Sequence, residues 1–141
     1  MPLTSLAPNL MVHDVGRTVD YYTRVLGFDF AMGVTDEGQK PVFAWPAPEP
    51  LCYAMVTSGA VHIMFQSKKS LAAELPSLEN VKVGGAFTLY IECDDLEARF
   101  AALDDEDTVF LKRPHVTFYG MREFYFKDIN GYILVFAQKA A

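Results

Sequence analysis

The segment from Phe118 to Phe136, FYGMREFYFKDINGYILVF, restricts the fold of this chain more than any other part. Two runs rich in aromatic and branched side chains, 124–126 and 132–136, favour β-strands. The residues between them, 128–131, end in Asn-Gly, a pair that tolerates the positive φ angles of a short hairpin turn. The segment therefore predicts an antiparallel β-hairpin.

The turn also predicts which side chains of the hairpin share a face, because faces alternate along each strand. A two-residue loop and a four-residue loop predict the same pairing. One face then carries Phe124, Phe126, Ile133, Val135 and Ala137, and the other carries Glu123, Tyr125, Lys127, Tyr132, Leu134 and Phe136. The first of these faces has no polar side chain, so the hairpin predicts no metal site there.

A weak internal repeat relates the two halves of the chain. Superposing residues 12–15 on residues 93–96 aligns Asp14 with Asp95, and each aspartate stands where a carboxylate can accept hydrogen bonds from the first N–H groups of a helix. Each copy predicts a strand, a capped helix and about three further strands. Two such copies favour a paired module around a shared concave sheet.

The predicted elements define an α+β chain of two modules joined by a linker. The predicted helices cover 15–26 and 96–103, and the predicted strands cover 9–12, 28–32, 42–45, 52–57, 61–66, 87–93, 109–111, 121–127 and 132–137. Module 1 spans about 5–67 and module 2 about 85–138. The linker, about 68–84, is polar, with one helical turn predicted near 71–75.

Composition limits the classes of partner. The net charge of −6 argues against nucleic acid or an anionic membrane and favours a cationic ligand, although a solvated acidic surface explains the same charge. Cys52 and Cys93 form no close-spaced pair and predict reduced, buried thiols. The N-terminal residues do not read as a signal peptide, and no apolar run approaches the ~18 residues of a membrane span. We therefore expect a cytoplasmic protein.

Three segments carry a resemblance to a known family: LMVHDVGRTVDYYTRVLGFDF at 10–30, IECDDLEARFAAL at 91–103 and YGMREFYFKDINGYILVF at 119–136. The chain resembles the vicinal oxygen chelate superfamily, which holds glyoxalase I, fosfomycin-resistance enzymes, extradiol dioxygenases and bleomycin-resistance proteins. The resemblance implies two βαβββ modules that form an open, cup-shaped mixed sheet in one domain, usually completed in a homodimer.

The family's metal-ligand positions, as the resemblance implies them, fall on Ala7, Thr88 and Val135, with a further position near Ile63 or Met64. None of these is a His or a carboxylate, whereas the family's lyase, transferase and dioxygenase reactions use the metal as a Lewis acid. The resemblance therefore points to the metal-free, bleomycin-resistance-like branch. We expect a binding protein with no cofactor, no metal and no catalytic residue, and the sequence leaves open whether any catalysis remains.

The alternation of side chains between the two faces of each strand, together with the resemblance, predicts the residues of a ligand cavity. They are Asn9, Met11, Trp45, Tyr90, Glu92, His115, Tyr119, Phe124, Phe126 and Val135. An aromatic cavity with a few polar groups suits a planar, partly cationic small molecule. Trp45 is either a core anchor or a stacking platform. The competing interpretation is that these aromatic side chains only pack the sheet.

Two other functions compete with the binding protein. One is a divalent-metal enzyme with relocated ligands, which requires three of His13, His62, Glu92 and His115 to converge. The other is a dimeric scaffold with a filled cup, which predicts no cavity of ligand size.

Overall fold

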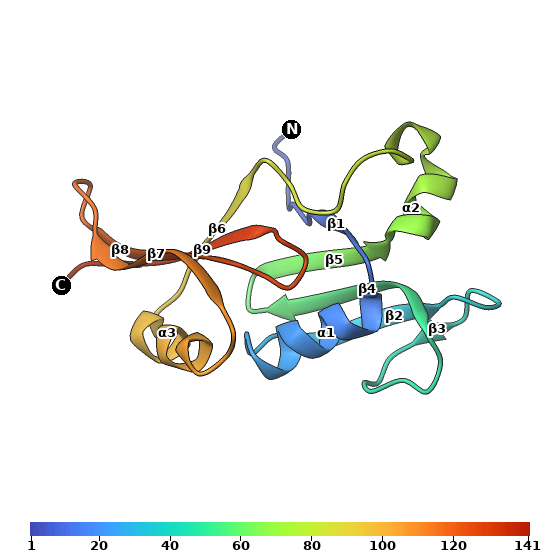
Figure 1. The fold of residues 1–141 in the computed structure, drawn as a ribbon, viewed down its shortest axis with the longest axis horizontal. Helices are drawn as coiled ribbons and strands as arrows, with labels where there is room; N and C mark the ends of the chain where they lie inside the picture. Colours follow the sequence, from blue (N-terminus) through green and yellow to red (C-terminus); the bar gives the residue numbers. More distant parts are fainter. The chain divides into compact units, whose positions relative to one another are not determined.

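The computed structural model describes residues 1–141, which form two compact units, residues 1–83 and residues 84–141. Each unit contains a strand, a helix and then further strands, so the predicted α+β class and the two βαβββ modules are confirmed (Figure 1). None of the helices has both the length and the apolar character that crossing a membrane requires.

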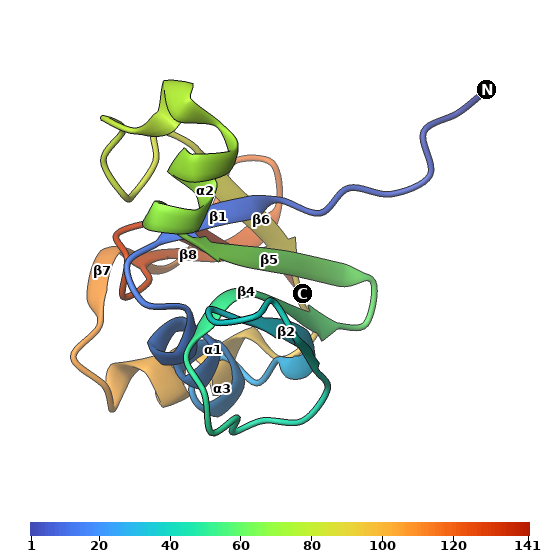
Figure 2. The same ribbon diagram turned by 90° about the vertical axis from the view of Figure 1, so that its right-hand side faces the viewer.

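Unit 1 is a five-stranded sheet with two helices. Its elements in chain order are β1 (Asn9–Val12), α1 (Val15–Arg24), β2 (Asp29–Thr35), β3 (Pro41–Val42), β4 (Leu51–Ser58), β5 (Val61–Ser67), α2 (Lys68–Glu74) and the 3₁₀ helix η1 (Pro76–Leu78). The strand order is β1-β5-β4-β2-β3, with β1 parallel to β5 and the other pairs antiparallel. In Figure 2, α2 lies beside β1 and β5, and α1 lies near β2 and β4.

Helix α1 begins where the sequence predicts. The carboxylate of Asp14 accepts a hydrogen bond from the backbone N–H of Arg17 at 3.0 Å and so satisfies one of the free donors of the first turn. The buried ring of Tyr22 packs on Phe65 of β5, with ring centroids 4.7 Å apart. This packing covers one face of the sheet; the opposite one is the open face of unit 1.

One predicted strand of unit 1 is wrong in its bounds, and one predicted helical turn is longer than expected. Strand β3 ends at Val42, and residues 43–50 form a loop, because the prolines at 46, 48 and 50 have no N–H for a strand ladder. The helical turn predicted near 71–75 in the polar linker is part of helix α2, which begins earlier, at Lys68. The Ser67 hydroxyl caps its first turn by accepting from the N–H of Ser70 at 3.2 Å.

Unit 2 is a four-stranded sheet with one helix. Its elements are β6 (Thr88–Glu92), α3 (Leu96–Asp104), β7 (Val109–Val116), β8 (Met121–Lys127) and β9 (Ile133–Lys139), and the strand order is β6-β9-β8-β7 with β6 parallel to β9. Asp95 precedes α3 but does not cap it, because its carboxylate accepts from Nε of Arg99 at 2.7 Å. The N–H of Leu96 donates instead to the side chain of Gln138 at 3.1 Å.

The predicted face pairing of the C-terminal hairpin is wrong, because its loop has an odd number of residues. The last strand pair is Lys127 with Ile133, which leaves residues 128–132 in the loop. The carboxylate of Asp128 closes this loop by accepting from the backbone N–H groups of Asn130 and Tyr132, both at 2.9 Å. Gly131 has a φ of 90°, a value that glycine adopts without strain.

This register moves two predicted cavity residues into the core of unit 2. Phe124 lies opposite Phe136 and Phe126 lies opposite Leu134, on the face covered by α3. Phe124 and Phe126 are 0% exposed, and the ring of Phe124 is 5.5 Å from that of Phe100 in α3. The prediction that Phe124 and Phe126 line a cavity is therefore wrong.

Candidate functional site

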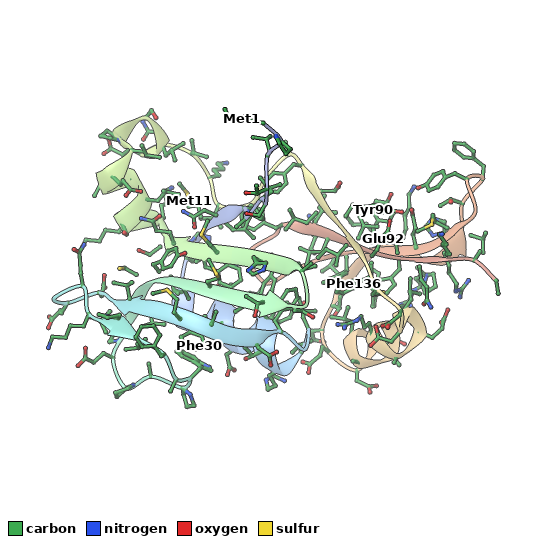
Figure 3. All side chains as sticks on the ribbon, turned by 180° about the vertical axis from the view of Figure 1, so that it is seen from behind. Met1, Met11, Phe30, Tyr90, Glu92 and Phe136 are labelled. Atoms are coloured by element: carbon green, nitrogen blue, oxygen red, sulfur yellow. The ribbon has the colours of Figure 1, made fainter.

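The face of the unit 2 sheet opposite α3, the open face of unit 2, carries two rows of side chains. The first row crosses β6, β9 and β8 through Tyr90, Val135 and Tyr125. The second row crosses β6, β9, β8 and β7 through Glu92, Ala137, Glu123 and His115. Figure 3 labels Tyr90 and Glu92 on β6. The sheet thus brings four predicted site residues, Tyr90, Glu92, His115 and Val135, to one face.

The carboxylate of Glu123 is the centre of this face. It is fully buried, and its Oε2 atom accepts hydrogen bonds from the hydroxyls of Tyr90 at 2.5 Å and Tyr119 at 2.7 Å. Its Oε1 atom accepts only from the Tyr125 hydroxyl, at 3.5 Å. Tyr119, a predicted site residue from the β7–β8 turn, therefore reaches the same carboxylate as Tyr90.

Burial and Glu123 together raise the pKa values of the surrounding phenols. Burial raises the pKa of Tyr90 from its usual 10.0, and the hydrogen bond to Glu123 raises it further. The hydrogen bond to Glu123 is the main cause of the raised pKa of Tyr119. Burial, followed by the charge of Glu123, raises the pKa of Tyr125. At neutral pH all three hydroxyls are donors.

Alkaline titration is expected to show this coupling. Because the folded state holds these phenol protons more tightly than the unfolded chain does, their stabilisation is complete below pH 10 and is lost as the pH rises through the raised values. In Glu123→Gln, part of the phenolate absorbance of the folded protein should develop at lower pH than in the wild type. Superimposable titration curves for the two proteins would contradict the coupling.

His115 and Lys112 border Tyr125. Nδ1 of His115 lies 2.8 Å from the carbonyl oxygen of Arg113, so this nitrogen carries the proton and donates. The imidazole stacks on Tyr125 with ring centroids 6.3 Å apart, and Nζ of Lys112 lies 5.1 Å from the Tyr125 centroid. The ring of Tyr125 already holds one positive charge of the protein itself.

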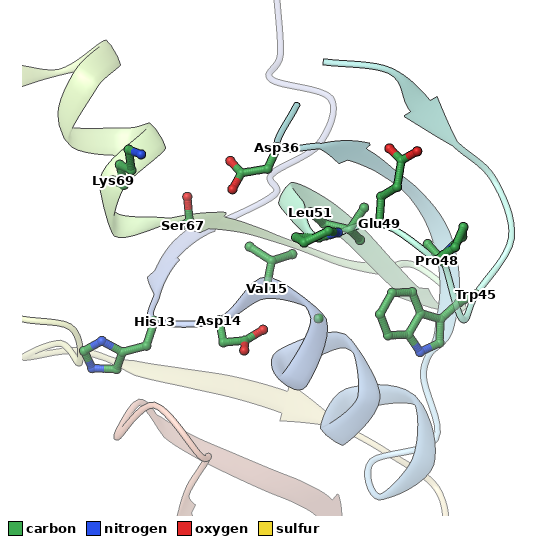
Figure 4. Close-up of a pocket in the computed structure, with 13 residues that line it drawn as sticks. His13, Asp14, Val15, Asp36, Trp45, Pro48, Glu49, Leu51, Ser67 and Lys69 are labelled. Carbon is green, nitrogen blue, oxygen red and sulfur yellow. The ribbon is translucent and has the colours of Figure 1, made fainter. Parts of the chain in front are cut away.

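A cavity of about 530 Å³ lies in unit 1 at the start of α1 (Figure 4). Its walls come from the beginnings of α1 and α2, the turn after β2 and the proline-rich loop before β4. The lining consists of His13, Asp14, Val15, Gly16, Asp36, Trp45, Ala47, Pro48, Glu49, Pro50, Leu51, Ser67 and Lys69. Three of these side chains are carboxylates and one is a lysine, so the cavity is acidic.

Trp45 is anchored and also forms part of the cavity wall. Its indole packs on Phe30 with ring centroids 5.7 Å apart. On the other side it approaches α1 at Gly16, where a Cβ atom would stand 3.4 Å from Cη2 of the indole. Packing on Phe30 and the approach to Gly16 anchor Trp45, and its role as a stacking platform for a ligand stays a prediction.

A second cavity, of about 730 Å³, contains Asn9 together with Tyr53, Gln66 and residues of α2. Nδ2 of Asn9 donates to Oε1 of Gln66 at 2.9 Å. Met11 pairs with Gln66 in the sheet but is 6% exposed and does not line this cavity. The sequence does not single out Tyr53, Gln66 or Asp36 as site residues. The alternation of side chains between the two faces of the strand 52–57 could have indicated Tyr53, whereas Asp36 lies in a turn without a periodic pattern.

The comparisons with known proteins identify the family. A sequence model of the Glyoxalase/Bleomycin resistance protein/Dioxygenase superfamily matches residues 4–136, and the chain belongs to this superfamily. A search of curated proteins found no match.

Solved structures share the fold at low sequence identity. TioX from Micromonospora sp. ML1 is 17% identical with a TM-score of 0.67, over 97% of this chain and 99% of that chain. A superfamily member from Sphaerobacter thermophilus DSM 20745 is 17% identical with a TM-score of 0.70, over 99% of both chains. An integron cassette protein of V. cholerae is 22% identical with a TM-score of 0.66, over 98% of this chain and 97% of that chain.

The residues at the family's metal positions do not fit a metal centre. Ala7 and Val135 have no donor atom in their side chains, and Thr88 has only a hydroxyl. Nowhere in residues 1–141 do three or more His, Cys, Asp or Glu side chains group so that they could hold a metal ion. The convergence of three residues that a relocated metal site requires is therefore not found.

Proposed function

We propose that this chain is a small-molecule-binding protein that holds an aromatic organic cation in the cavity beside Trp45, without a metal and without covalent chemistry. One observation carries the proposal: an indole and three carboxylates line the same cavity. Its volume of about 530 Å³ is of the size that drug-like ligands occupy.

The chemistry of the lining supports a ligand that is both flat and positively charged. The Trp45 face attracts a cation through its ring quadrupole, and it offers a planar ligand a surface for stacking. Asp36 and Glu49 form no ion pair within the chain, so both charges are available to a ligand. The net charge of −6 adds long-range attraction for a cation.

The test uses a charged and an uncharged probe of the same ring system, N-methylquinolinium and quinoline. Trp45 is the single tryptophan of the chain, so its fluorescence reports binding at this cavity alone. We expect N-methylquinolinium to quench Trp45 and quinoline to bind several-fold more weakly, since each exposed carboxylate attracts a cation by about 0.2–1 kcal/mol and a cation–π contact adds about 0.5–1 kcal/mol.

A double variant, Asp36→Asn with Glu49→Gln, separates charge from shape. The double variant should lower the affinity for N-methylquinolinium and leave the affinity for quinoline unchanged. Lys69→Met should raise the affinity for N-methylquinolinium. Equal affinity of the wild type for both probes, or no quenching by either, would refute the proposal. The homodimer and the cytoplasmic location stay predictions, and sedimentation of the purified chain measures the first.

A further inference from the structure

We infer that the ligand of the Trp45 cavity is a zwitterion, whose cationic aromatic ring lies against Trp45 and whose carboxylate binds Lys69. The inference rests on the proposed function, because it adds an anionic group to the aromatic cation proposed there. It concerns unit 1 alone, since every residue that lines this cavity belongs to residues 1–83.

The charged side chains of the cavity lining are separated in space. In Figure 4, Lys69 and Ser67 lie on one side of the cavity, Trp45 and Glu49 lie on the other side, and Asp36 lies between them. A cation that stacks on Trp45 therefore binds at the end with the indole and Glu49. The end with Lys69 stays open to another part of the same ligand.

Lys69 has no negative partner within the chain. No ion pair includes it, although Asp14, Asp36 and Glu49 line the same cavity. Its side chain is exposed, so water solvates the ammonium group while the cavity has no ligand. A ligand with only a positive charge would be repelled by Lys69, whereas a ligand with charges of both signs complements the two ends of the cavity.

Ser67 adds a neutral donor at the same end as Lys69. Its hydroxyl oxygen accepts a hydrogen bond from the N–H of Ser70 at 3.2 Å, and no hydrogen bond within the chain uses its hydroxyl proton. A hydroxyl group can accept one hydrogen bond and still donate its own proton. A ligand carboxylate can therefore accept both from the ammonium of Lys69 and from the hydroxyl of Ser67.

The balance of charge in the lining favours a carboxylate over a phosphate. One lysine faces three carboxylates in this cavity, so a group with a charge near −2 would be repelled more strongly than a group with a charge of −1. An uncharged amide would fill the same space without forming an ion pair. These charges select a ligand with one positive and one negative group.

The experiment compares two probes of nearly the same shape, 1-(3-carboxypropyl)quinolinium and its carboxamide, by quenching of Trp45 fluorescence in the whole chain. The first is a zwitterion and the second is a simple cation. We expect the zwitterion to bind about twofold to fivefold more tightly than the carboxamide, the effect of one exposed ion pair.

Two lysine variants locate the negative group. Lys69→Met should lower the affinity for the zwitterion and raise the affinity for N-methylquinolinium, and a misfolded variant could not produce effects of opposite sign. Lys68→Met removes the same charge from the neighbouring residue, which does not line the cavity. It should leave the preference for the zwitterion over the carboxamide unchanged.

The possible outcomes separate this inference from the proposed function. If N-methylquinolinium quenches Trp45 but the zwitterion binds no more tightly than the carboxamide, the inference is wrong and the proposed function stands. A preference for the zwitterion that persists in Lys69→Met would also overturn the inference. If none of the probes quenches Trp45, both the inference and the proposed function are wrong.

Discussion

Replacing Phe124 by alanine is expected to destabilise the protein by about 3–5 kcal/mol, the usual cost of removing a fully buried phenylalanine. The side chain is 0% exposed and touches rings from three elements: Phe100 in α3, Phe110 in β7 and Phe136 in β9. Alanine would leave a cavity that these aromatic neighbours cannot fill without moving the helix. Urea unfolding followed by circular dichroism measures the change.

Phe118 provides the matched control in the same hairpin. It sits in the β7–β8 turn and is 100% exposed, so Phe118→Ala makes the same chemical change without a buried cavity. Its effect should stay within about 0.5 kcal/mol of zero, as surface substitutions usually do. If Phe118→Ala cost as much as Phe124→Ala, the assignment of Phe124 to the helix-covered face would be wrong.

Asp128→Ala is expected to destabilise the protein by about 2–3 kcal/mol, because two backbone N–H groups would lose a charged acceptor. Asp128 is 5% exposed and accepts from Asn130 and Tyr132, both at 2.9 Å. The N–H of Tyr132 is buried, so water does not fully replace the lost bond. Thermal unfolding of the variant and the wild type measures this effect.

Two further variants separate the loop contacts from the loss of a negative charge. Asp107→Ala removes an exposed carboxylate from a chain of net charge −6 and should change stability by no more than about 0.5 kcal/mol. Asp128→Asn keeps an acceptor oxygen and should lower the free energy of unfolding by less than Asp128→Ala does. If Asp128→Ala left the stability unchanged, the carboxylate would not be what holds the five-residue loop.

The sequence was sufficient for those elements that local signals define. Asp14 stands directly before an amphipathic run, and the structure shows the predicted cap on Arg17. Strands β1 and β8 have the predicted bounds, because β-favouring residues end abruptly at polar ones. The alternation of Tyr90 and Glu92 on β6 also placed both on one face, as the register confirms.

The errors arise where a long-range contact decides between local alternatives. Asn-Gly is compatible with even hairpin loops, but the Asp128 carboxylate stabilises an odd one, and one residue of difference exchanges the two faces. Asp95 has the position of a cap, yet Arg99 takes its carboxylate. The Glu123 cluster combines residues from β6, β8 and the turn before β8, so no spacing along the chain could reveal it.

The open face of unit 1 has a consequence for the protein's response to oxidants. Met32, Met55 and Met64 are side by side across β2, β4 and β5, each half-buried, with Asn9 completing the row. Oxidation to the sulfoxide turns each thioether polar, and a reductase can reverse the change. The opposite face, which α1 covers, has buried Cys52 as its one sulfur among the paired strands. Peroxide would therefore alter the polarity of one side of this sheet and leave the packing beneath α1 intact.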